Sequence, residues 1–317
     1  MRYFTSVSDI GDIRQALSEA SAVKADRFAH TELGRNRTLM MVFFNSSLRT
    51  RLSTQKAALN LGMNVIVLDI DAGAWKLETE RGVVMDGDKP EHLLEAIPVM
   101  GCYCDIIGVR SFAGLQSREY DYGEQVIGQF IRHSGRPVFS MEAATGHPLQ
   151  GFADIITIEE YKRKPRPKVV LSWAPHPKAL PQAVPNSFVE WSLAAGYDVV
   201  ITHPRGYELD ERFTRGALIE YDQQRAFEGA DFIYAKNWSA YAGDNYGAIL
   251  SDDRGWTVDS RKMELTDNAF FMHCLPVRRG MIVTDEVIES ENSLVIPQAA
   301  NREISATVVL KRMLESL

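Results

Sequence analysis

Short apolar runs alternate with stretches of helical periodicity along the whole chain, and this alternation most restricts the fold. An unbroken apolar run suits a strand covered on both faces, whereas apolar residues every three or four positions suit a helix lying on a sheet. The runs predict buried strands at residues 39–44, 64–68, 105–109, 137–139, 169–173, 198–202, 232–235 and 270–273. The periodic stretches predict helices at 50–61, 91–101, 124–133, 182–195, 222–229, 285–289 and about 301–317. The order indicates an α/β protein built of parallel sheets wound by helices.

The chain has 317 residues, enough for two domains of ordinary size. Residues 161–168, Tyr-Lys-Arg-Lys-Pro-Arg-Pro-Lys, interrupt the alternation just before the strand predicted at 169–173. We interpret this basic stretch as the boundary between two α/β domains. The alternative is a solvated surface loop within one domain.

Charge and cysteine content exclude several classes of protein. Lys and Arg total 35 against 42 Asp and Glu, which opposes broad attraction to nucleic acid or anionic lipid, so an anionic ligand would need a local basic pocket. The 3 cysteines, Cys102, Cys104 and Cys274, supply neither a disulfide framework nor a set of metal ligands. No apolar run approaches the ~20 residues that cross a bilayer. We therefore expect a cytoplasmic protein without a targeting segment, metal, cofactor, nucleic-acid partner or membrane partner.

One strand-to-helix turn has the composition of an anion site. Residues 45–51 read Asn-Ser-Ser-Leu-Arg-Thr-Arg and lead into the helix predicted at 50–61. Hydroxyls, guanidiniums and unpaired backbone N–H groups at a helix N-terminus favour a phosphate. The alternative is a plain N-cap by Ser46 or Ser47 with exposed arginines. Neither glycine-rich nucleotide motif occurs in the chain.

Further candidates for chemistry lie near the ends of predicted strands. Arg110 follows one strand, where open α/β sheets place ligands, and provides a second cation for an anion. His147 stands directly before Pro148, which suits the first turn of a helix, and its imidazole suits donation to a developing oxyanion. A lone His before Pro is also often an incidental loop residue. His273 and Cys274 are adjacent in a strand and point to opposite faces, which disfavours covalent thiol catalysis.

Together these segments resemble the aspartate and ornithine transcarbamylases over nearly the whole chain. Residues 47–51 are similar to their Ser-Thr-Arg-Thr-Arg phosphate motif, 147–150 to His-Pro-x-Gln, and 273–276 to the His-Cys-Leu-Pro of the ornithine branch. The resemblance implies two parallel-sheet α/β domains: 1–150 for carbamoyl phosphate, joined by a returning C-terminal helix at 300–317, and 151–299 for the amine substrate. It also implies a homotrimer whose active sites are shared between neighbouring subunits.

The resemblance carries roles over residue by residue. It assigns carbamoyl-phosphate binding to Ser47, Leu48, Arg49, Thr50, Trp75, Arg110, His147, Gln150, Cys274, Leu275 and Arg302, and catalytic roles to His147, Arg110, Thr50 and Cys274. Trp75 would reach in from the adjacent subunit; an interface or core aromatic is the alternative. The neutral side-chain amine would attack the carbamoyl carbon directly, without a covalent enzyme intermediate.

Departures from the plain ornithine enzyme bear on the substrate. That enzyme has a Ser-Met-Gly loop and an Asp that meets the α-ammonium of ornithine, whereas residues 234–241 here read Tyr-Ala-Lys-Asn-Trp-Ser-Ala-Tyr. Lys236 would repel an ammonium and attract a carboxylate, so the α-nitrogen is expected to be acylated. With Glu142 and with Trp-Ala-Pro-His-Pro at 173–177, the chain resembles the N-acylornithine transcarbamylases.

The acyl group is expected to be succinyl. The acetyl-type relatives carry Glu in the loop that here contains Pro90, and a carboxylate there would repel the second carboxylate of a succinyl group. The expected ligands of N-succinyl-L-ornithine are Glu142, His176, Lys236, Arg278 and Pro90, with the His, Lys and Arg as cations. A Pro90 that merely stiffens the loop is the alternative.

Different functions remain open beside this one. Within the family, the chain could act on N-acetylornithine or on plain ornithine. A non-catalytic paralogue that kept only the anion pocket is a possibility of a different class. A nicotinamide oxidoreductase is disfavoured because the glycine fingerprint is missing.

Overall fold

The computed structural model describes residues 1–70 and 72–317. The chain divides into two units by its internal contacts. The first unit comprises Met1–Gly114, Glu119–Leu149 and Arg302–Leu317, and the second comprises Leu115–Arg118 and Gln150–Asn301. Each unit contains its own five-stranded parallel sheet, so the predicted α/β class is confirmed.

The sheet of the first unit has the strand order β1-β7-β6-β2-β3, with every pairing parallel. In that order the strands are Tyr3–Phe4, Val138–Glu142, Ile106–Arg110, Thr38–Phe43 and Asn64–Asp69. The central strands β6 and β7 are buried along their whole length, as parallel strands covered on both faces must be. Both strands contain apolar runs, which is why the sequence pattern predicts strands in these regions. The edge strand β3 is only half-buried.

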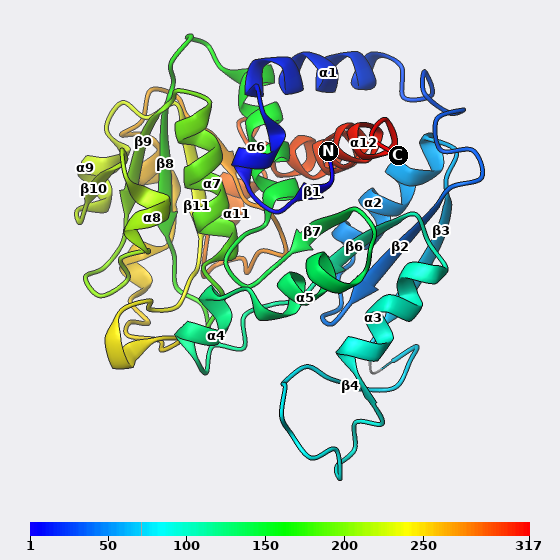
Figure 1. Cartoon of the computed structure of the whole chain (residues 1–317). Coiled ribbons are helices and arrows are strands. Elements are labelled where there is room, and N and C mark those ends of the chain that lie inside the picture. Colours follow the sequence, from blue (N-terminus) through cyan, green and yellow to red (C-terminus); the bar gives the residue numbers. More distant parts are fainter. Residues whose placement is uncertain (71) are drawn as a thin grey trace. The chain divides into compact units, whose positions relative to one another are not determined.

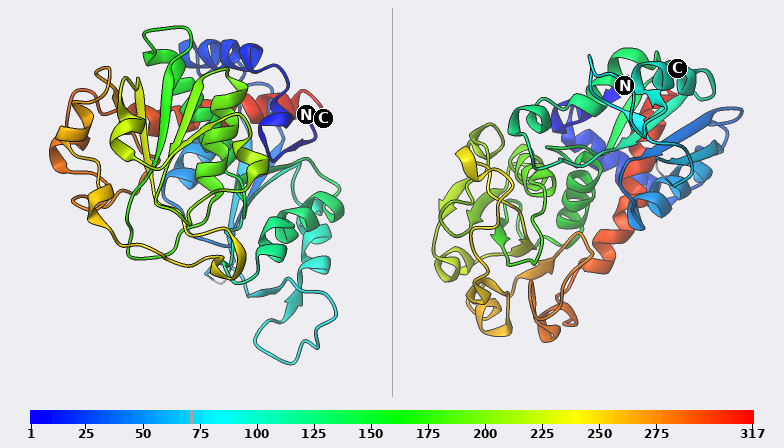
Figure 2. Two further views of the ribbon diagram at one scale, coloured as in Figure 1. Left: turned by 90° about the vertical axis from the view of Figure 1, so that its left-hand side faces the viewer. Right: turned by 90° about the horizontal axis from the view of Figure 1, so that it is seen from below.

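Helices α1 (Ile13–Ala25), α2 (Arg49–Asn60), α3 (Leu93–Cys102), α4 (Arg118–Tyr122) and α5 (Gln125–His133) belong wholly or mostly to the first unit. The last helix, α12 (Val295–Leu314), lies between α1 and the strands in Figures 1 and 2. Its Arg312 guanidinium pairs with Glu19 of α1 at 2.9 Å. The expected return of the C-terminal helix to the first domain is therefore confirmed.

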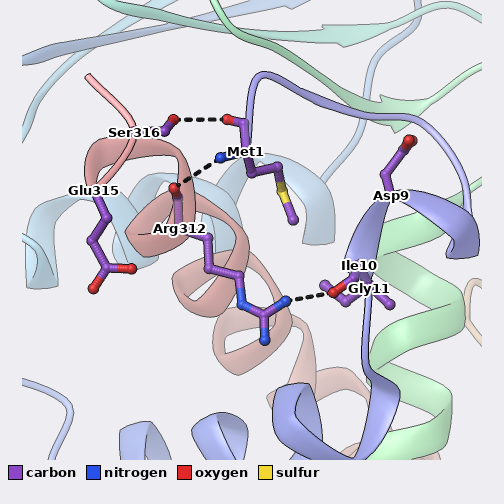
Figure 3. A pocket seen from close by; sticks show the side chains of 7 residues that line it. All are labelled: Met1, Asp9, Ile10, Gly11, Arg312, Glu315 and Ser316. Carbon is purple, nitrogen blue, oxygen red and sulfur yellow. Dashed lines mark hydrogen bonds between the residues drawn. The ribbon is translucent and has the colours of Figure 1, made fainter.

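The two chain ends lie side by side in the first unit (Figure 3). The Ser316 hydroxyl donates to the carbonyl oxygen of Met1 at 3.0 Å, and Arg312 donates to the carbonyl oxygen of Ile10 at 2.6 Å. These contacts rim an open polar cavity of about 380 Å³. All three guanidinium nitrogens of Arg312 are engaged, because Nε and Nη2 bond Glu19. Arg312 therefore holds the chain ends together.

A loop projects from the first unit between two very short strands. The strands β4 (Leu77–Glu78) and β5 (Glu91–His92) pair in parallel and close the loop at its base. Figure 1 shows the loop extending away beyond α3. Val84 in this loop is 81% exposed, and Trp75 just before β4 is 61% exposed, so this part of the chain presents apolar residues to its surroundings.

The sheet of the second unit has the order β10-β9-β8-β11-β12, again all parallel. In that order the strands are Leu218–Glu220, Asp198–Thr202, Lys168–Trp173, Phe232–Lys236 and Phe270–Met272. The helices are α6 (Pro148–Tyr161), α7 (Ala183–Ala194), α8 (Glu211–Thr214), α9 (Gln223–Phe227), α10 (Ser260–Met263) and α11 (Asp285–Ile288).

Close packing of α6 against α7 requires a glycine at position 151. Phe152 and Trp191 stack with ring centroids 5.1 Å apart. A Cβ atom at Gly151 would lie 2.3 Å from Trp191 Cδ1, so no larger residue fits there without moving the indole. Contact of this kind is what lets α6 lie deep in the second unit.

Every predicted strand overlaps an observed one, but one interpretation is wrong. The basic stretch 161–168 lies inside the second unit, where it joins α6 to β8, so it is not the boundary between the units. Its cations pair within that unit: Lys164 Nζ lies 2.9 Å from Asp231 Oδ1, and Arg166 Nη2 lies 2.7 Å from Asp198 Oδ1. The basic residues of 161–168 therefore lie on the surface of the second unit and do not form a linker between the units. Among the helices in the described ranges, none combines the length and apolarity needed to cross a bilayer.

Candidate active site

Three parallel strands of the first unit end at the same edge of their sheet, and each end carries a polar residue expected in the site. Strand β2 leads into the turn before α2, β6 ends at Arg110, and β7 ends at Glu142. Neighbouring parallel strands present their carboxyl ends together, where α/β sheets bind ligands. The topology thus brings together segments that are far apart in the sequence.

The turn from β2 to α2 has an N-terminal cap as well as cationic side chains. The Ser47 hydroxyl accepts from the backbone N–H of Thr50 at 3.2 Å, so Ser47 caps the helix. Arg49 is half-buried at the first helical position, and the Leu48 side chain is 67% exposed. Capping and anion binding are compatible here, because a helix start leaves further N–H groups unpaired.

Thr50 lies where two guanidinium groups converge. Its Oγ1 atom accepts from Arg110 Nη1 at 3.0 Å and from Arg302 Nη2 at 3.1 Å. Thr50 is 1%, Arg302 3% and Arg110 7% exposed. Two buried cations this close repel each other unless negative charge compensates them. Glu142 supplies one negative charge, 2.7 Å from Arg110, and a phosphorylated ligand would add to it.

Glu142 and His147 complete this group in the first unit. Glu142 Oε2 lies 2.7 Å from Arg110 Nη1 and 3.5 Å from His147 Nε2. The loop that carries His147 is held by Glu124, whose carboxylate accepts from the backbone N–H of Thr145 at 2.8 Å and from its hydroxyl at 2.6 Å. The expected residues Thr50, Arg110, Glu142, His147 and Arg302 therefore form one buried cluster.

In the second unit, Cys274 and Leu275 lie in a turn after β12. Leu275 has φ +54°, a left-handed conformation that non-glycine residues rarely adopt and that functional sites often contain. Its backbone N–H donates to His273 Nδ1 at 2.8 Å. That imidazole nitrogen is thus occupied by the turn itself, which agrees with the prediction that His273 does not activate the neighbouring thiol.

His176 and Arg278 touch, and the contact corrects one expectation. Arg278 Nε donates to His176 Nε2 at 3.1 Å, while His176 Nδ1 lies 2.8 Å from the carbonyl oxygen of Lys178 and donates to it. Burial first, and the charges of Arg278 and Lys236 after it, lower the pKa of His176. His176 is therefore neutral near pH 7 and not one of the expected cations; positive charge comes from Lys236 and Arg278. Sequence alone could not show this, because Arg278 is distant along the chain.

Pro90 lies in the projecting loop of the first unit and Trp75 lies just before β4; both are exposed. The Trp75 indole donates to Glu91 Oε2 at 2.7 Å. Within the described residues, no group of His, Cys, Asp and Glu side chains is arranged to hold a metal ion.

Sequence reasoning missed two buried polar residues close to expected ones. Asp154 and Gln298 are both 0% exposed and are bonded to each other at 2.7 Å. Asp154 follows Gln150 by one helical turn of α6, a spacing that places two side chains on the same helix face. That spacing was the available signal, whereas nothing local marked Gln298.

Comparison with known proteins agrees with this geometry. Residues 2–160 match the family described as "Aspartate/ornithine carbamoyltransferase, carbamoyl-P binding domain", and residues 181–313 match its "Asp/Orn binding domain". The chain is 75% identical over 317 residues, 100% of both chains, to the N-succinylornithine carbamoyltransferase of Bacteroides fragilis. It is 37% identical to the N-acetylornithine carbamoyltransferase of Xanthomonas campestris pv. campestris, over 92% of each chain.

Among solved structures, an N-acetyl-L-ornithine transcarbamylase mutant complexed with carbamyl phosphate and N-succinyl-L-norvaline superposes with a TM-score of 0.91. It is 34% identical, covering 99% of this chain and 100% of that one. In that mutant proline replaces a glutamate, and further mutants of the same glutamate, to alanine, valine and serine, were complexed with the same two ligands.

Proposed function

Because this chain belongs to the aspartate/ornithine carbamoyltransferase family, we infer that it transfers a carbamoyl group from carbamoyl phosphate to the side-chain amine of N-succinyl-L-ornithine. The products are N-succinyl-L-citrulline and phosphate, in arginine biosynthesis. The observation that carries this assignment is the full-length identity of 75% to an N-succinylornithine carbamoyltransferase. The 3.0 and 3.1 Å contacts of Arg110 and Arg302 with Thr50 support it.

The phosphate is held at the start of α2 and by the two converging guanidiniums. Ser47, Leu48, Arg49 and Thr50 surround it with hydroxyl, backbone N–H and cationic donors. Arg110 and Arg302 both donate to the Thr50 hydroxyl, so both guanidiniums are close enough to share an anionic phosphate as acceptor. Domain 1–150, with 300–317, is thus the carbamoyl-phosphate domain.

The carbamoyl carbonyl is polarised by Arg110, Thr50 and His147. Their donors face an oxygen whose negative charge grows as the amine attacks, so they bind the transition state more strongly than the ground state. Gln150 binds the carbamoyl amide, while Cys274 and Leu275 orient the attacking amine through the backbone of their turn. The amine attacks the carbonyl carbon, and phosphate departs with the bonding electrons of the broken C–O bond. The proton lost from the amine passes to solvent or phosphate.

The acylornithine is bound by domain 151–299 and by two residues outside it. Lys236 and Arg278 meet the carboxylates of the substrate, and neutral His176 accepts from Arg278 Nε and so orients that guanidinium. Glu142, which pairs with Arg110, also contributes to acylornithine binding. Pro90 leaves the succinyl carboxylate unopposed where a glutamate would repel it.

A homotrimer with shared active sites accounts for an otherwise unexplained surface of the first unit. This surface contains four exposed apolar residues: Leu48 (67%) at the start of α2, Leu52 (59%) and Leu59 (55%) on α2, and Ile66 (40%) on the edge strand β3. Apolar patches on edge elements are typical of protein contacts. In such a trimer, Trp75 would reach into the neighbour's site. We further propose that the enzyme is cytoplasmic, since its three cysteines are free thiols.

Initial rates with carbamoyl phosphate and each of N-succinyl-L-ornithine, N-acetyl-L-ornithine and L-ornithine test the function. We expect a clear preference for the succinyl compound. Preference for the acetyl compound would instead support the activity of the 37% identical relative. Transfer to none of the three would refute the carbamoyltransferase assignment.

A further inference from the structure

A chain of buried polar side chains in the second unit joins α6, α12 and the turn after β12. Asp154 of α6 and Gln298 of α12 are both 0% exposed. Asp154 Oδ1 accepts from Gln150 Nε2 at 2.7 Å and from Gln298 Nε2 at 2.7 Å. Gln298 Oε1 in turn accepts from the backbone N–H of His273 at 3.0 Å.

One acceptor therefore orients both amides. A glutamine side chain has a donor end and an acceptor end, and Asp154 Oδ1 draws the donor end of each toward itself. The carbonyl oxygen of Gln150 is consequently turned away from Asp154. An amide oxygen in that orientation suits an N–H donor, which on carbamoyl phosphate is the carbamoyl NH₂ and not the phosphate.

The same acceptor also fixes the turn after β12. Gln298 presents its carbonyl oxygen to His273, the residue before Cys274, because its NH₂ group is committed to Asp154. The left-handed Leu275 follows, with φ +54°. Burial first, and nearby Asp154 and Cys274 after it, raise the pKa of the Tyr234 phenol, so Asp154 and the Cys274 turn share one buried environment.

We propose that Asp154 is a positioning residue for carbamoyl transfer: it holds the Gln150 amide with its carbonyl oxygen toward the carbamoyl NH₂ and, through Gln298, holds the Cys274 turn. The proposal rests on the proposed function, in which Gln150 meets the carbamoyl group. Asp154 itself is fully buried, so its proposed action runs through Gln150 and Gln298. Misplacing a group by about 1 Å can cost on the order of 100-fold in rate, so a positioning role is large enough to measure.

Binding of two probes separates this role from a structural one. Phosphonoacetamide carries the amide of the carbamoyl donor, whereas inorganic phosphate lacks it. In calorimetry, we expect Asp154→Ala to weaken phosphonoacetamide binding by about tenfold or more, as for a lost hydrogen bond at a buried site, and to leave phosphate binding within about twofold. Asp154→Asn should retain most affinity, because its Oδ1 atom still accepts from both amides.

A double-mutant cycle on kcat tests whether Asp154 acts through Gln150. We expect Asp154→Ala to slow the wild-type enzyme more than it slows Gln150→Ala, since a lost partner cannot be misplaced; the slowing that remains in Gln150→Ala belongs to the Cys274 turn, which Asp154 holds through Gln298. The matched control is Thr157→Val, one turn further along α6. It removes the bond from Asn301 to Thr157 at 3.0 Å, which disturbs the same pair of helices without touching Gln150. This control should bind both probes normally.

Several results would overturn the proposal: equal weakening of both probes in Asp154→Ala, an additive cycle, or a Thr157→Val variant with the same defect. If Asp154→Ala is recovered unfolded, Asp154→Ser is measured instead, because its shorter side chain cannot reach both amides; normal phosphonoacetamide binding there refutes the role. Neither probe involves the acylornithine. A wild-type enzyme could therefore bind the two probes as expected and yet not carbamoylate N-succinyl-L-ornithine. That result would refute the proposed substrate and would leave the positioning role of Asp154 unaffected.

Discussion

Arg110 Nη1 lies 2.7 Å from Glu142 Oε2, in an ion pair whose members are only 7% and 8% exposed. We propose that Arg110 binds carbamoyl phosphate and Glu142 the acylornithine, and in that proposal the pair links the ligands of the two substrates. A buried pair of this kind stabilises little overall, yet removing one partner leaves the other charge buried without compensation.

Replacing Arg110 by Ala should lower kcat/KM for carbamoyl phosphate by about 100- to 1000-fold, the usual effect of removing one oxyanion donor. It should also lower the free energy of unfolding by roughly 3–5 kcal/mol, because Glu142 loses its partner. Steady-state kinetics and urea denaturation check both effects. In the control Glu142→Gln, the charge is removed while an oxygen acceptor remains, so stability should fall less. Near-normal carbamoyl-phosphate use by Arg110→Ala would contradict the site.

Replacing Pro90 by Glu should shift the enzyme from succinyl- toward acetylornithine. The new carboxylate repels the second carboxylate of the succinyl group, and the ratio of kcat/KM values should fall by about tenfold or more, as for one like-charge contact in a poorly solvated pocket. Pro90→Ala, which adds no charge, serves as the control and should keep the succinyl preference. An unchanged ratio in Pro90→Glu would leave only the stiffening role for Pro90.

His203 should make the fold sensitive to acid. Burial lowers its pKa, its Nδ1 lies 2.9 Å from the carbonyl oxygen of Pro204, and it is 0% exposed. Below the pKa of about 6.5 that a histidine has in an unfolded chain, His203 is protonated in the unfolded chain but stays neutral in the folded one. The free energy of unfolding is therefore highest above that pH and decreases as the pH falls. Urea denaturation at pH 8 and pH 5.5 measures the loss. His203→Gln should flatten the slope; an unaltered slope would assign the effect to other groups.

Replacing Leu52 by Glu should break the proposed trimer. The side chain is 59% exposed on α2, and a carboxylate buried in an apolar contact costs far more than one left in water. Sedimentation should show smaller species, and activity should fall with assembly because Trp75 is proposed to reach into the neighbour's site. Ala22→Glu, on an exposed position of α1, adds the same charge elsewhere and should remain trimeric. A trimeric, active Leu52→Glu enzyme would place the contact on another surface.

Strands and helices with a clear apolar pattern in their own residues could be predicted from the sequence, and elements without such a pattern could not. Strand β9 was predicted with its observed ends, Asp198–Thr202, because an apolar run covers it. Strands β1 and β10 were missed because one has two residues and the other is an edge strand that begins with an exposed Leu218. Helix α1 buries Ala16, Ala20 and Val23 at helical spacing, but its small residues gave a weak apolar signal.

The site divides in the same way. Continuous motifs pointed to Thr50 and His147, a strand end pointed to Arg110, and the structure places the three together. The lowered pKa of His176 comes first from burial and then from Arg278 and Lys236, and the proposed role of Asp154 depends on its bond from Gln298; both depend on contacts between distant parts of the chain. No local pattern encodes such pairs, because only the fold brings them within bonding distance.

The spacing of Gln298 and Arg302 on α12 has a consequence for how this chain can change. One residue bonds Asp154 and the other Thr50, and both bonds require a fixed rotation about the helix axis. Inserting a single residue between them would turn everything after it by about 100° and carry Arg302 to another face. Proteins related to this chain should therefore tolerate substitutions along α12 far better than the insertion or deletion of one residue within it.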